Sequence, residues 1–157
     1  MYTSTETVVA GAQSTRIERC YNRFHLMISQ VTTVGTKVQR KLIDYHDAEG
    51  RSFNEQPAIF QLQKSLSVSY YDLRSPQDVR TEITRTTYDS SGNLLETQNP
   101  TGGREINTYY AAAGEAGCPA NPGGFVHFLK SKSVIPSPDF RAAPTTRILH
   151  TYADLPS

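Results

Sequence analysis

The run Tyr88-Asp89-Ser90-Ser91-Gly92-Asn93-Leu94 leads into a second turn motif, Asn99-Pro100-Thr101-Gly102, and then into Tyr109. In the first motif the Asp89 side chain caps a turn, and Gly92 supplies the positive φ that follows a type I turn. In the second motif Pro100 presets φ at the corner. Gly92 and Gly102 lie 10 positions apart, which leaves room for one short strand between two reversals. The whole stretch therefore predicts strand, turn, strand, turn, strand.

Alternation of apolar and polar residues extends this pattern along the chain. The period-two runs cover residues 17–31, 37–45, 62–71, 81–88, 105–110, 125–134 and 145–152, and the first of them is read as one continuous strand. No stretch of about 12 residues has helical apolar spacing without an interrupting Pro, Gly or β-branched cluster. We therefore expect an all-β fold, an antiparallel meander of hairpins in an open curved sheet with little helix.

Length, charge and composition exclude several functional classes. The chain has 157 residues, which suits one domain of ordinary size. Its formal charge of +1 provides no field for binding nucleic acid or an anionic membrane. The absence of Trp and the excess of Tyr (9) over Phe (6) suit half-buried strand surfaces. Residues 1–15 contain neither a basic segment nor a long apolar run, so we expect no signal peptide in this chain and no membrane contact by it.

An internal repeat links the turn motif to an earlier part of the chain. Asp47-Ala48-Glu49-Gly50 follows Tyr45 and has the same Asp-x-x-Gly form as the motif after Tyr88, so both are expected at hairpin tips. Tyr88 and Tyr109 lie 21 positions apart, and Gly50 and Gly92 lie 42 apart, twice that spacing. The first copy is degenerate because His46 is inserted in it. The sequence thus indicates one good repeat copy at 88–109, one damaged copy and no clean third.

These motifs resemble the tyrosine-aspartate (YD) repeat of Rhs proteins and of the B subunits of bacterial insecticidal toxin complexes. Two flanking stretches add to the resemblance. The first runs Arg19-Cys20-Tyr21-Asn22-Arg23-Phe24-His25-Leu26, and the second, residues 114–132, reads GEAGCPANPGGFVHFLKSK. Both are similar to the middle region of those B subunits, which virulence-plasmid-B-type proteins share. The resemblance covers roughly residues 16–152.

The resemblance implies that the chain is a section of a larger polypeptide. In that family the repeats build an antiparallel sheet that forms a hollow shell around the toxic region of a C-type partner subunit. The expected partners are therefore the remainder of the parent chain and this cargo. The expected location is the bacterial cytoplasm during assembly, followed by secretion or release as part of a toxin complex. The chain lacks a blade-like repeat of about 40 residues and a self-cleavage motif, so neither propeller docking nor proteolysis is implied.

The domain organisation expected from these patterns has three parts. Residues 1–15 form a flexible N-terminal segment, residues 16–152 form the YD-repeat-like β region, and residues 153–157 form a C-terminal tail. The residues assigned a role are structural turn and repeat positions: Tyr45, Asp47, Gly50, Tyr88, Asp89, Gly92, Pro100, Gly102 and Tyr109.

The side chains that carry chemistry do not combine into a recognisable catalytic, cofactor or metal site. The histidines, His25, His46, His127 and His150, lie in four separate segments without ligand spacing. Cys20 and Cys118 lack CxxC spacing and are read as free thiols, with one long-range disulfide as the alternative. Carboxylate pairs such as Asp44 with Asp47, or Asp72 with Asp78, suggest no glycosidase. We therefore expect a non-enzymatic protein without cofactor or metal.

Two other functions remain open from the sequence. A free-standing β-sandwich binding module, for a glycan or a protein ligand, would use the tyrosines as an aromatic platform instead of packing them between repeats. A hydrolase with an unrecognised site is the third reading. A shell section differs from a module in that it leaves long edge strands unpaired, and such edges favour self-association.

Overall fold

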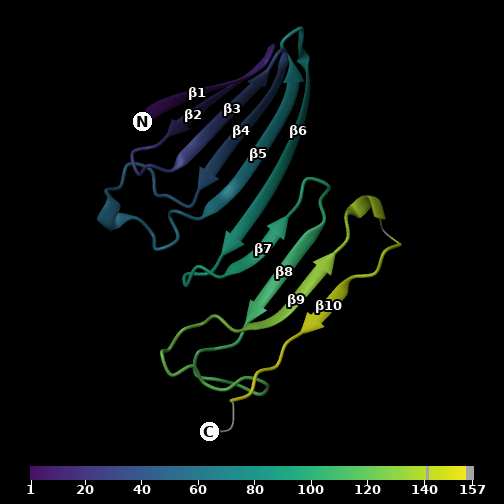
Figure 1. Cartoon of the computed structure of the whole chain (residues 1–157). Coiled ribbons are helices and arrows are strands. Elements are labelled where there is room, and N and C mark those ends of the chain that lie inside the picture. The colour runs from purple at the N-terminus through teal and green to yellow at the C-terminus, as the bar shows by residue number, and fades with distance from the viewer. Residues whose placement is uncertain (141, 155–157) are drawn as a thin grey trace. The chain divides into compact units, whose positions relative to one another are not determined.

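The computed structural model describes residues 1–140 and 142–154, and these form one open antiparallel meander of ten strands in chain order (Figure 1). The first six strands are β1 (Tyr2–Ala10), β2 (Gln13–Tyr21), β3 (Met27–Val34), β4 (Lys37–Tyr45), β5 (Gln63–Asp72) and β6 (Ser75–Tyr88). The remaining four are β7 (Leu94–Gln98), β8 (Arg104–Tyr109), β9 (Leu129–Ile135) and β10 (Thr146–Leu149). Two single-turn 3-10 helices, η1 (Phe53–Glu55) and η2 (Pro138–Phe140), are the helical content of these residues. The expected all-β meander is confirmed.

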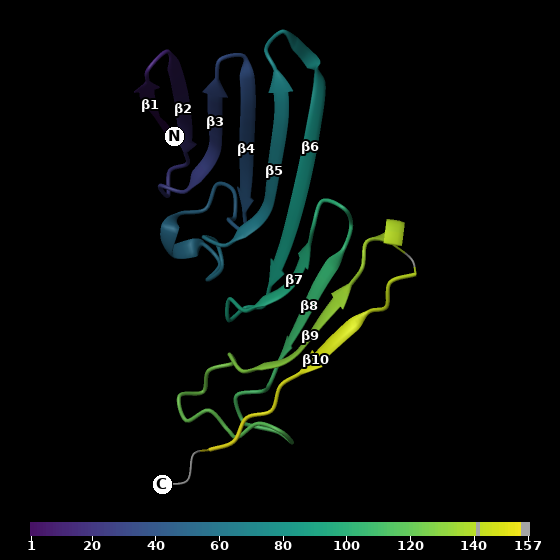
Figure 2. The ribbon, with the colours of Figure 1, turned by 45° about the vertical axis from the view of Figure 1, so that its right-hand side comes forward.

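The chain divides into two compact units, Met1–Thr84 and Arg85–Ser157, where the sequence suggested one continuous region. Strand β6 contributes residues to both. Within each unit the strands lie side by side in chain order (Figure 2). One sheet order runs through all ten strands.

The amino terminus differs from the expected flexible segment, because Tyr2–Ala10 is strand β1. It pairs in continuous register with β2, from Tyr2 opposite Tyr21 to Ala10 opposite Gln13. The two-residue turn between them has Gly11 at φ 61°, which is the first central position of a type II′ turn. The β-branched residues of β1 favour the extended backbone, and the II′ turn matches the twist of the paired strands. Of the expected tail 153–157, residues 155–157 lie outside the described residues.

The run at 17–31 is not one strand, because the chain reverses at residues 22–26. Strand β2 ends at Tyr21 and β3 begins at Met27. The Asn22 side chain accepts the backbone N–H groups of Phe24 and Leu26, and this fixes the reversal. Period-two counting cannot detect such a turn, because its outer residues continue the apolar alternation.

The remaining strands follow the predicted runs with shifted ends. The run at 37–45 is β4, while the 81–88 run belongs to a longer strand, β6. The runs at 125–134 and 145–152 are shorter as strands, namely Leu129–Ile135 and Thr146–Leu149. Residues 125–128 belong instead to a loop, where the Asn121 side chain accepts the backbone N–H of Phe125.

The core of each unit is thin. The apolar residues with less than one-tenth of their surface exposed are Val38 and Phe60 in the first unit and Tyr110 and Cys118 in the second. No large side chain among the described residues is completely buried. Phe60 is covered by a loop cluster, with its ring 5.3 Å from Phe24 and 5.4 Å from Phe53. A single layer of strands leaves both faces open, and a stable domain normally packs two layers.

Candidate functional site

Three five-residue turns in the chain share one backbone geometry. They occupy residues 22–26, 89–93 and 99–103. In each turn the first residue donates its N–H to the carbonyl of the fifth, at 2.9, 3.0 and 2.9 Å respectively. The fourth residue donates its N–H to the carbonyl of the first, at 3.1, 3.1 and 3.0 Å. We call these the Asx turns, because each begins with Asn22, Asp89 or Asn99.

The side chain of the first residue organises each Asx turn. Its Oδ1 accepts the N–H of the third residue at 2.9 Å from Asn22, 2.9 Å from Asp89 and 3.2 Å from Asn99. In the first two turns it also accepts the N–H of the fifth residue, at 3.0 and 2.9 Å. These bonds satisfy donors that the strand ladder leaves free, which is why Asn and Asp favour such turns.

The fourth residue of every Asx turn has a positive φ. Gly92 has φ 86° and Gly102 has φ 85°, as the sequence predicts, but the equivalent residue of the first turn is His25 with φ 62°. A Cβ in this conformation costs about 1–2 kcal/mol. His25 Nδ1 lies 3.1 Å from the Tyr2 hydroxyl, a contact that partly offsets this cost.

The first Asx turn is the repeat copy that the sequence analysis missed. A search for Asp-x-x-Gly cannot find it, since it has Asn and His at those positions. The signal that identifies it is a strand-end tyrosine followed by an Asx residue, because Tyr21-Asn22 occupies the same structural place as Tyr88-Asp89.

Asp47-Ala48-Glu49-Gly50 is not a hairpin tip, contrary to expectation. It begins the long connection 46–62 between β4 and β5. Gly50 has φ 78°, but the turn bond runs from Arg51 N–H to the Ala48 carbonyl, one residue later than in the Asx turns. The Gln56 amide holds this connection closed by bonding both the N–H and the carbonyl of Ala48, at 2.7 and 2.9 Å.

Four strands, β2, β4, β6 and β8, end in a tyrosine. We call these four the strand-end tyrosines: Tyr21, Tyr45, Tyr88 and Tyr109. Strand pairing shifts register immediately before each of them. The residue after each tyrosine donates its N–H to the carbonyl just before the next strand, through the backbone pairs Asn22–Leu26, His46–Leu62, Asp89–Asn93 and Tyr110–Phe128. The same closing hydrogen bond therefore spans a short turn at 22–26 and 89–93, and a long connection at 46–62 and 110–128.

Two strand-end tyrosines tie their strand to the preceding one. The Tyr45 hydroxyl donates to the Met27 carbonyl at 3.0 Å, and the Tyr109 hydroxyl donates to the Leu94 carbonyl at 3.1 Å. Met27 and Leu94 are the first residues of β3 and β7, so the two bonds occupy equivalent places. Desolvation by burial raises the pKa of both hydroxyls, which keeps them protonated as donors.

Asp89 has the most developed bonding of the predicted repeat positions. Burial by itself would raise the pKa of its carboxyl group. Hydrogen bonds from the Asn93 side chain and from backbone N–H groups of the turn outweigh burial, and the pKa is lowered. Asn93 Nδ2 donates both to Asp89 Oδ2 at 2.9 Å and to the Val126 carbonyl at 2.6 Å. The Asp89 turn therefore also anchors the connection 110–128. Pro100 and Gly102 are the second and fourth residues of the third Asx turn.

The Gly- and Pro-rich connection 110–128 is a folded loop. Glu115 and Cys118 exchange backbone hydrogen bonds at 3.1 and 2.9 Å, and the Glu115 carboxylate pairs with Lys130. The Tyr110 hydroxyl donates to the His150 carbonyl at 2.8 Å. Cys20 and Cys118 are both free thiols, and burial raises the pKa of Cys118. The buried Cys118 thiol therefore ionises less readily than an exposed cysteine.

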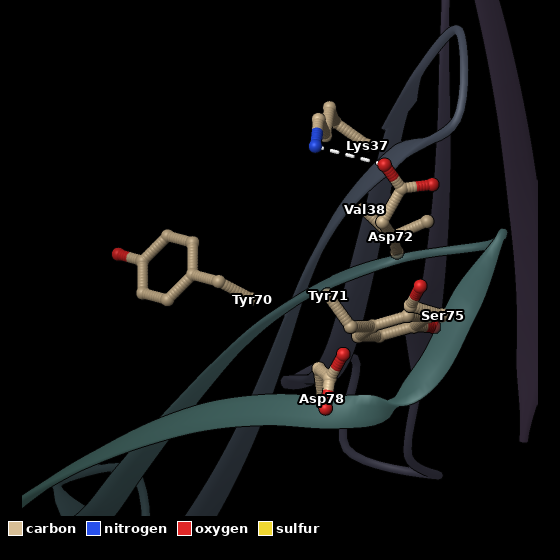
Figure 3. A pocket seen from close by; sticks show the side chains of 7 residues that line it. All are labelled: Lys37, Val38, Tyr70, Tyr71, Asp72, Ser75 and Asp78. Carbon is tan, nitrogen blue, oxygen red and sulfur yellow. Dashed lines mark ion pairs between the residues drawn. The ribbon is translucent and has the colours of Figure 1, made fainter.

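A groove of about 530 Å³ lies in the first unit (Figure 3). It is lined by Lys37, Val38, Tyr70, Tyr71, Asp72, Ser75 and Asp78. In Figure 3 the Tyr70 ring points away from the other labelled side chains. Lys37 Nζ lies 2.8 Å from Asp72 Oδ2, and this hydrogen bond is the largest cause that lowers the pKa of Asp72 to about 2. A carboxylate held ionised in this way is poorly suited to accept a proton near neutral pH.

The histidines are dispersed. The exposed His127 ring lies 4.3 Å from the Phe128 ring, and its Nδ1 is 3.4 Å from the Asn121 amide. Within residues 1–140 and 142–154, no three His, Cys, Asp or Glu side chains are grouped as metal ligands would be. That same part of the chain contains no helix of the length and apolarity needed to span a membrane.

Comparison with protein families, curated proteins and solved structures finds no match for this chain. Two features of the molecule itself bear on its function. One is the repeated hairpin end with its strand-end tyrosine, and the other is the single-layer sheet with its thin core.

Proposed function

We propose that this chain is a non-enzymatic structural section of a bacterial β-shell of the toxin-complex B or Rhs type, which encloses a toxic cargo region. The observation that carries the proposal is the hairpin end that recurs at Tyr21, Tyr45, Tyr88 and Tyr109. Each has the same register shift and the same closing hydrogen bond. A unit that recurs along one sheet is how repeat proteins build extended walls.

The thin core supports the same proposal. A repeat unit cannot bury its apolar face alone and depends on neighbours to cover it. Val38, Phe60, Tyr110 and Cys118 are the few well-buried apolar residues of the two units, and side chains such as Leu42 and Ile148 are 40% and 46% exposed. Such a sheet is suited to a position between further strands of a parent polypeptide. In that position its role is to wall off a C-type partner or cargo before secretion or release.

The first test of the proposal concerns the parent polypeptide. Coding sequence in frame with this segment should contain further Tyr-Asp-x-x-Gly motifs at the spacing of Tyr88 and Tyr109. The parent polypeptide, co-expressed with its cargo region, should protect that region from added protease. An Asp78→Asn variant changes the groove without touching the repeated turns, and it should leave protection unchanged. Digestion of the cargo at the rate of the unassembled region would contradict the proposal.

One observation favours a second candidate, a glycan-binding module. The groove of Figure 3 combines the aromatic ring of Tyr71 with the carboxylate of Asp78, and such pairs recognise sugars by stacking and hydrogen bonding. Binding of the full chain to a glycan array, lost in Asp78→Asn, would support this candidate. Binding that the variant leaves unchanged would remove the groove as its site.

A further inference from the structure

Within this chain, strand β1 lies at one end of the sheet order and presents an outer edge suited to pairing with another strand. It is the first strand in the sheet order, so no strand of the described chain lies beyond it. All nine of its residues are exposed, and it pairs with β2 without a register shift. It contains no Pro and no Lys, the residues that commonly prevent edge pairing, and its one formal charge is Glu6. Strand β10 at the other end of the order has only four residues and carries Arg147.

The hairpin geometry determines which backbone groups β1 presents. Ala10 and Gln13 flank a two-residue turn, so they form its closing hydrogen-bonded pair. Hydrogen-bonded and non-hydrogen-bonded pairs alternate along an antiparallel ladder. The odd-numbered residues Thr3, Thr5 and Thr7 therefore direct their N–H and carbonyl groups away from β2. These groups form a regular row of free donors and acceptors along the outer edge.

We propose that β1 pairs with β1 of a second copy of this chain, antiparallel and about a two-fold axis at Thr5. A two-fold axis between antiparallel strands places one residue opposite its own copy. An axis at Glu6 would set two carboxylates directly opposite each other, which is unfavourable. An axis at Thr7 would pair only residues 4–10. The Thr5-centred register sets Thr3 opposite Thr7 and keeps every odd-numbered pair hydrogen-bonded.

Charge and packing both favour the Thr5-centred register. It sets Glu6 of one copy opposite Ser4 of the other. Ser4 is the strand partner of Arg19 in β2. The Glu6 carboxylate of the second copy therefore lies on the same face of the sheet as the Arg19 guanidinium and in line with it. Within one chain Arg19 Nη1 already lies 3.0 Å from Glu6 Oε2, so the dimer surrounds both arginines with carboxylates. The register also sets Tyr2 opposite Val8, an apolar pair of which both members are exposed in the single chain.

Sedimentation velocity of the full chain over about 1–300 µM tests the proposal, since an interface of this small size gives weak association. We expect a concentration-dependent dimer. Thr5→Lys places two lysines opposite each other at the axis and should weaken association by at least about fivefold. The matched variant Ser4→Lys adds the same charge one residue away, opposite Glu6 of the second copy, and should associate as well as the wild type or better. Circular dichroism of both variants checks that the sheet is retained.

Amide hydrogen exchange gives a second measurement that does not depend on the variants. The N–H groups of Thr5 and Thr7 should exchange more slowly at high protein concentration, while those of Ser4 and Glu6, which face β2, should not change. A chain that is monomeric throughout the series would overturn the proposal. Equal weakening by the two lysine variants would overturn the register, and growth beyond dimers would indicate pairing through another edge. The dimer concerns this chain by itself, because a preceding strand of a parent polypeptide would occupy the same edge of β1. Cargo protection is measured on the parent polypeptide, so the proposed function stands or fails separately.

Discussion

Replacing Asp89 separates the hydrogen bonds of the Asx turn from the charge of its first residue. The carboxylate accepts Ser91 N–H, Asn93 N–H and Asn93 Nδ2, each at 2.9 Å. A typical hydrogen bond contributes about 0.5–1.5 kcal/mol, and loss of a comparable side-chain cap costs about 1 kcal/mol. Ser91 is exposed, so water replaces part of what Asp89→Ala removes. We expect Asp89→Ala to lower the free energy of unfolding of the second unit by about 1–2.5 kcal/mol.

Asp89→Asn is the matched variant, because the chain already uses Asn at the same place in its other two Asx turns. Asn22 Oδ1 accepts the two equivalent backbone N–H groups at 2.9 and 3.0 Å. The amide should therefore keep these two backbone bonds, but its Nδ2 cannot accept the hydrogen bond that Asp89 Oδ2 receives from Asn93 Nδ2. We expect a cost of about 0.5–1 kcal/mol at neutral pH, smaller than that of Asp89→Ala. Equal destabilisation by Asp89→Ala and Asp89→Asn would refute the assignment of stability to the hydrogen bonds.

Lowering the pH should reduce the stability of the wild type relative to that of Asp89→Asn. The pKa of Asp89 is lowered in the folded chain, so its contribution is fully present above the pKa of the unfolded chain, about 3.9. It is lost as pH falls through the lower folded-state pKa. Asp89→Asn lacks this loss, so the stability difference should shift toward the variant below about pH 4. Native-state hydrogen exchange at the Gly92 amide measures it locally, since two units need not unfold as one.

Three further predictions follow from the same geometry. His25→Gly should be more stable than His25→Ala by about 1 kcal/mol in urea unfolding, because only Gly relieves the Cβ strain at φ 62°. A more stable His25→Ala would contradict strain at this position of the Asx turn. Tyr109→Phe should lower the thermal midpoint through loss of one hydrogen bond of about 1 kcal/mol, whereas Tyr70→Phe, at an exposed tyrosine, should not. Equal effects of the two variants would show that the Tyr109–Leu94 hydrogen bond does not stabilise the sheet. The Asp72 carboxyl should titrate by NMR near pH 2, and Lys37→Met should move the midpoint up toward the ordinary value, while an unchanged midpoint would show that the ion pair does not cause the shift.

Prediction from sequence works best where the determining contacts are local. The turns at 89–93 and 99–103 could be predicted because Asp89 and Asn99 bond to backbone groups within four residues. Most strand runs could also be identified, because a two-residue period follows directly from the pleat. The turn at 22–26 is equally local, but it has Asn22 and His25 where the Asp-x-x-Gly pattern has Asp and Gly, so the pattern does not identify it.

The conformation of the long connections could not be predicted from local sequence patterns. Asp47 and Gly50 have the composition of a hairpin tip, yet they lie in an insertion closed by Gln56 and by the packing of Phe60. Nothing within four residues of Asp47 distinguishes this from a tight turn. The Lys37–Asp72 pair that lines the groove likewise joins two strands, so no motif could indicate it.

Local sequence patterns were enough to predict an all-β chain, turns at Gly92 and Gly102, and an open meander, because pleat period and turn conformation depend on neighbouring residues. Strand pairing in three dimensions was needed to show that Tyr2–Ala10 is an edge strand and that four tyrosines share one structural place. It was also needed to show that the hydroxyls of two of them, Tyr45 and Tyr109, tie neighbouring strands together. The Tyr45 and Tyr109 hydroxyls bond to carbonyls 18 and 15 residues away. Such partners are set by strand pairing, which brings together residues whose separation along the chain no local pattern records.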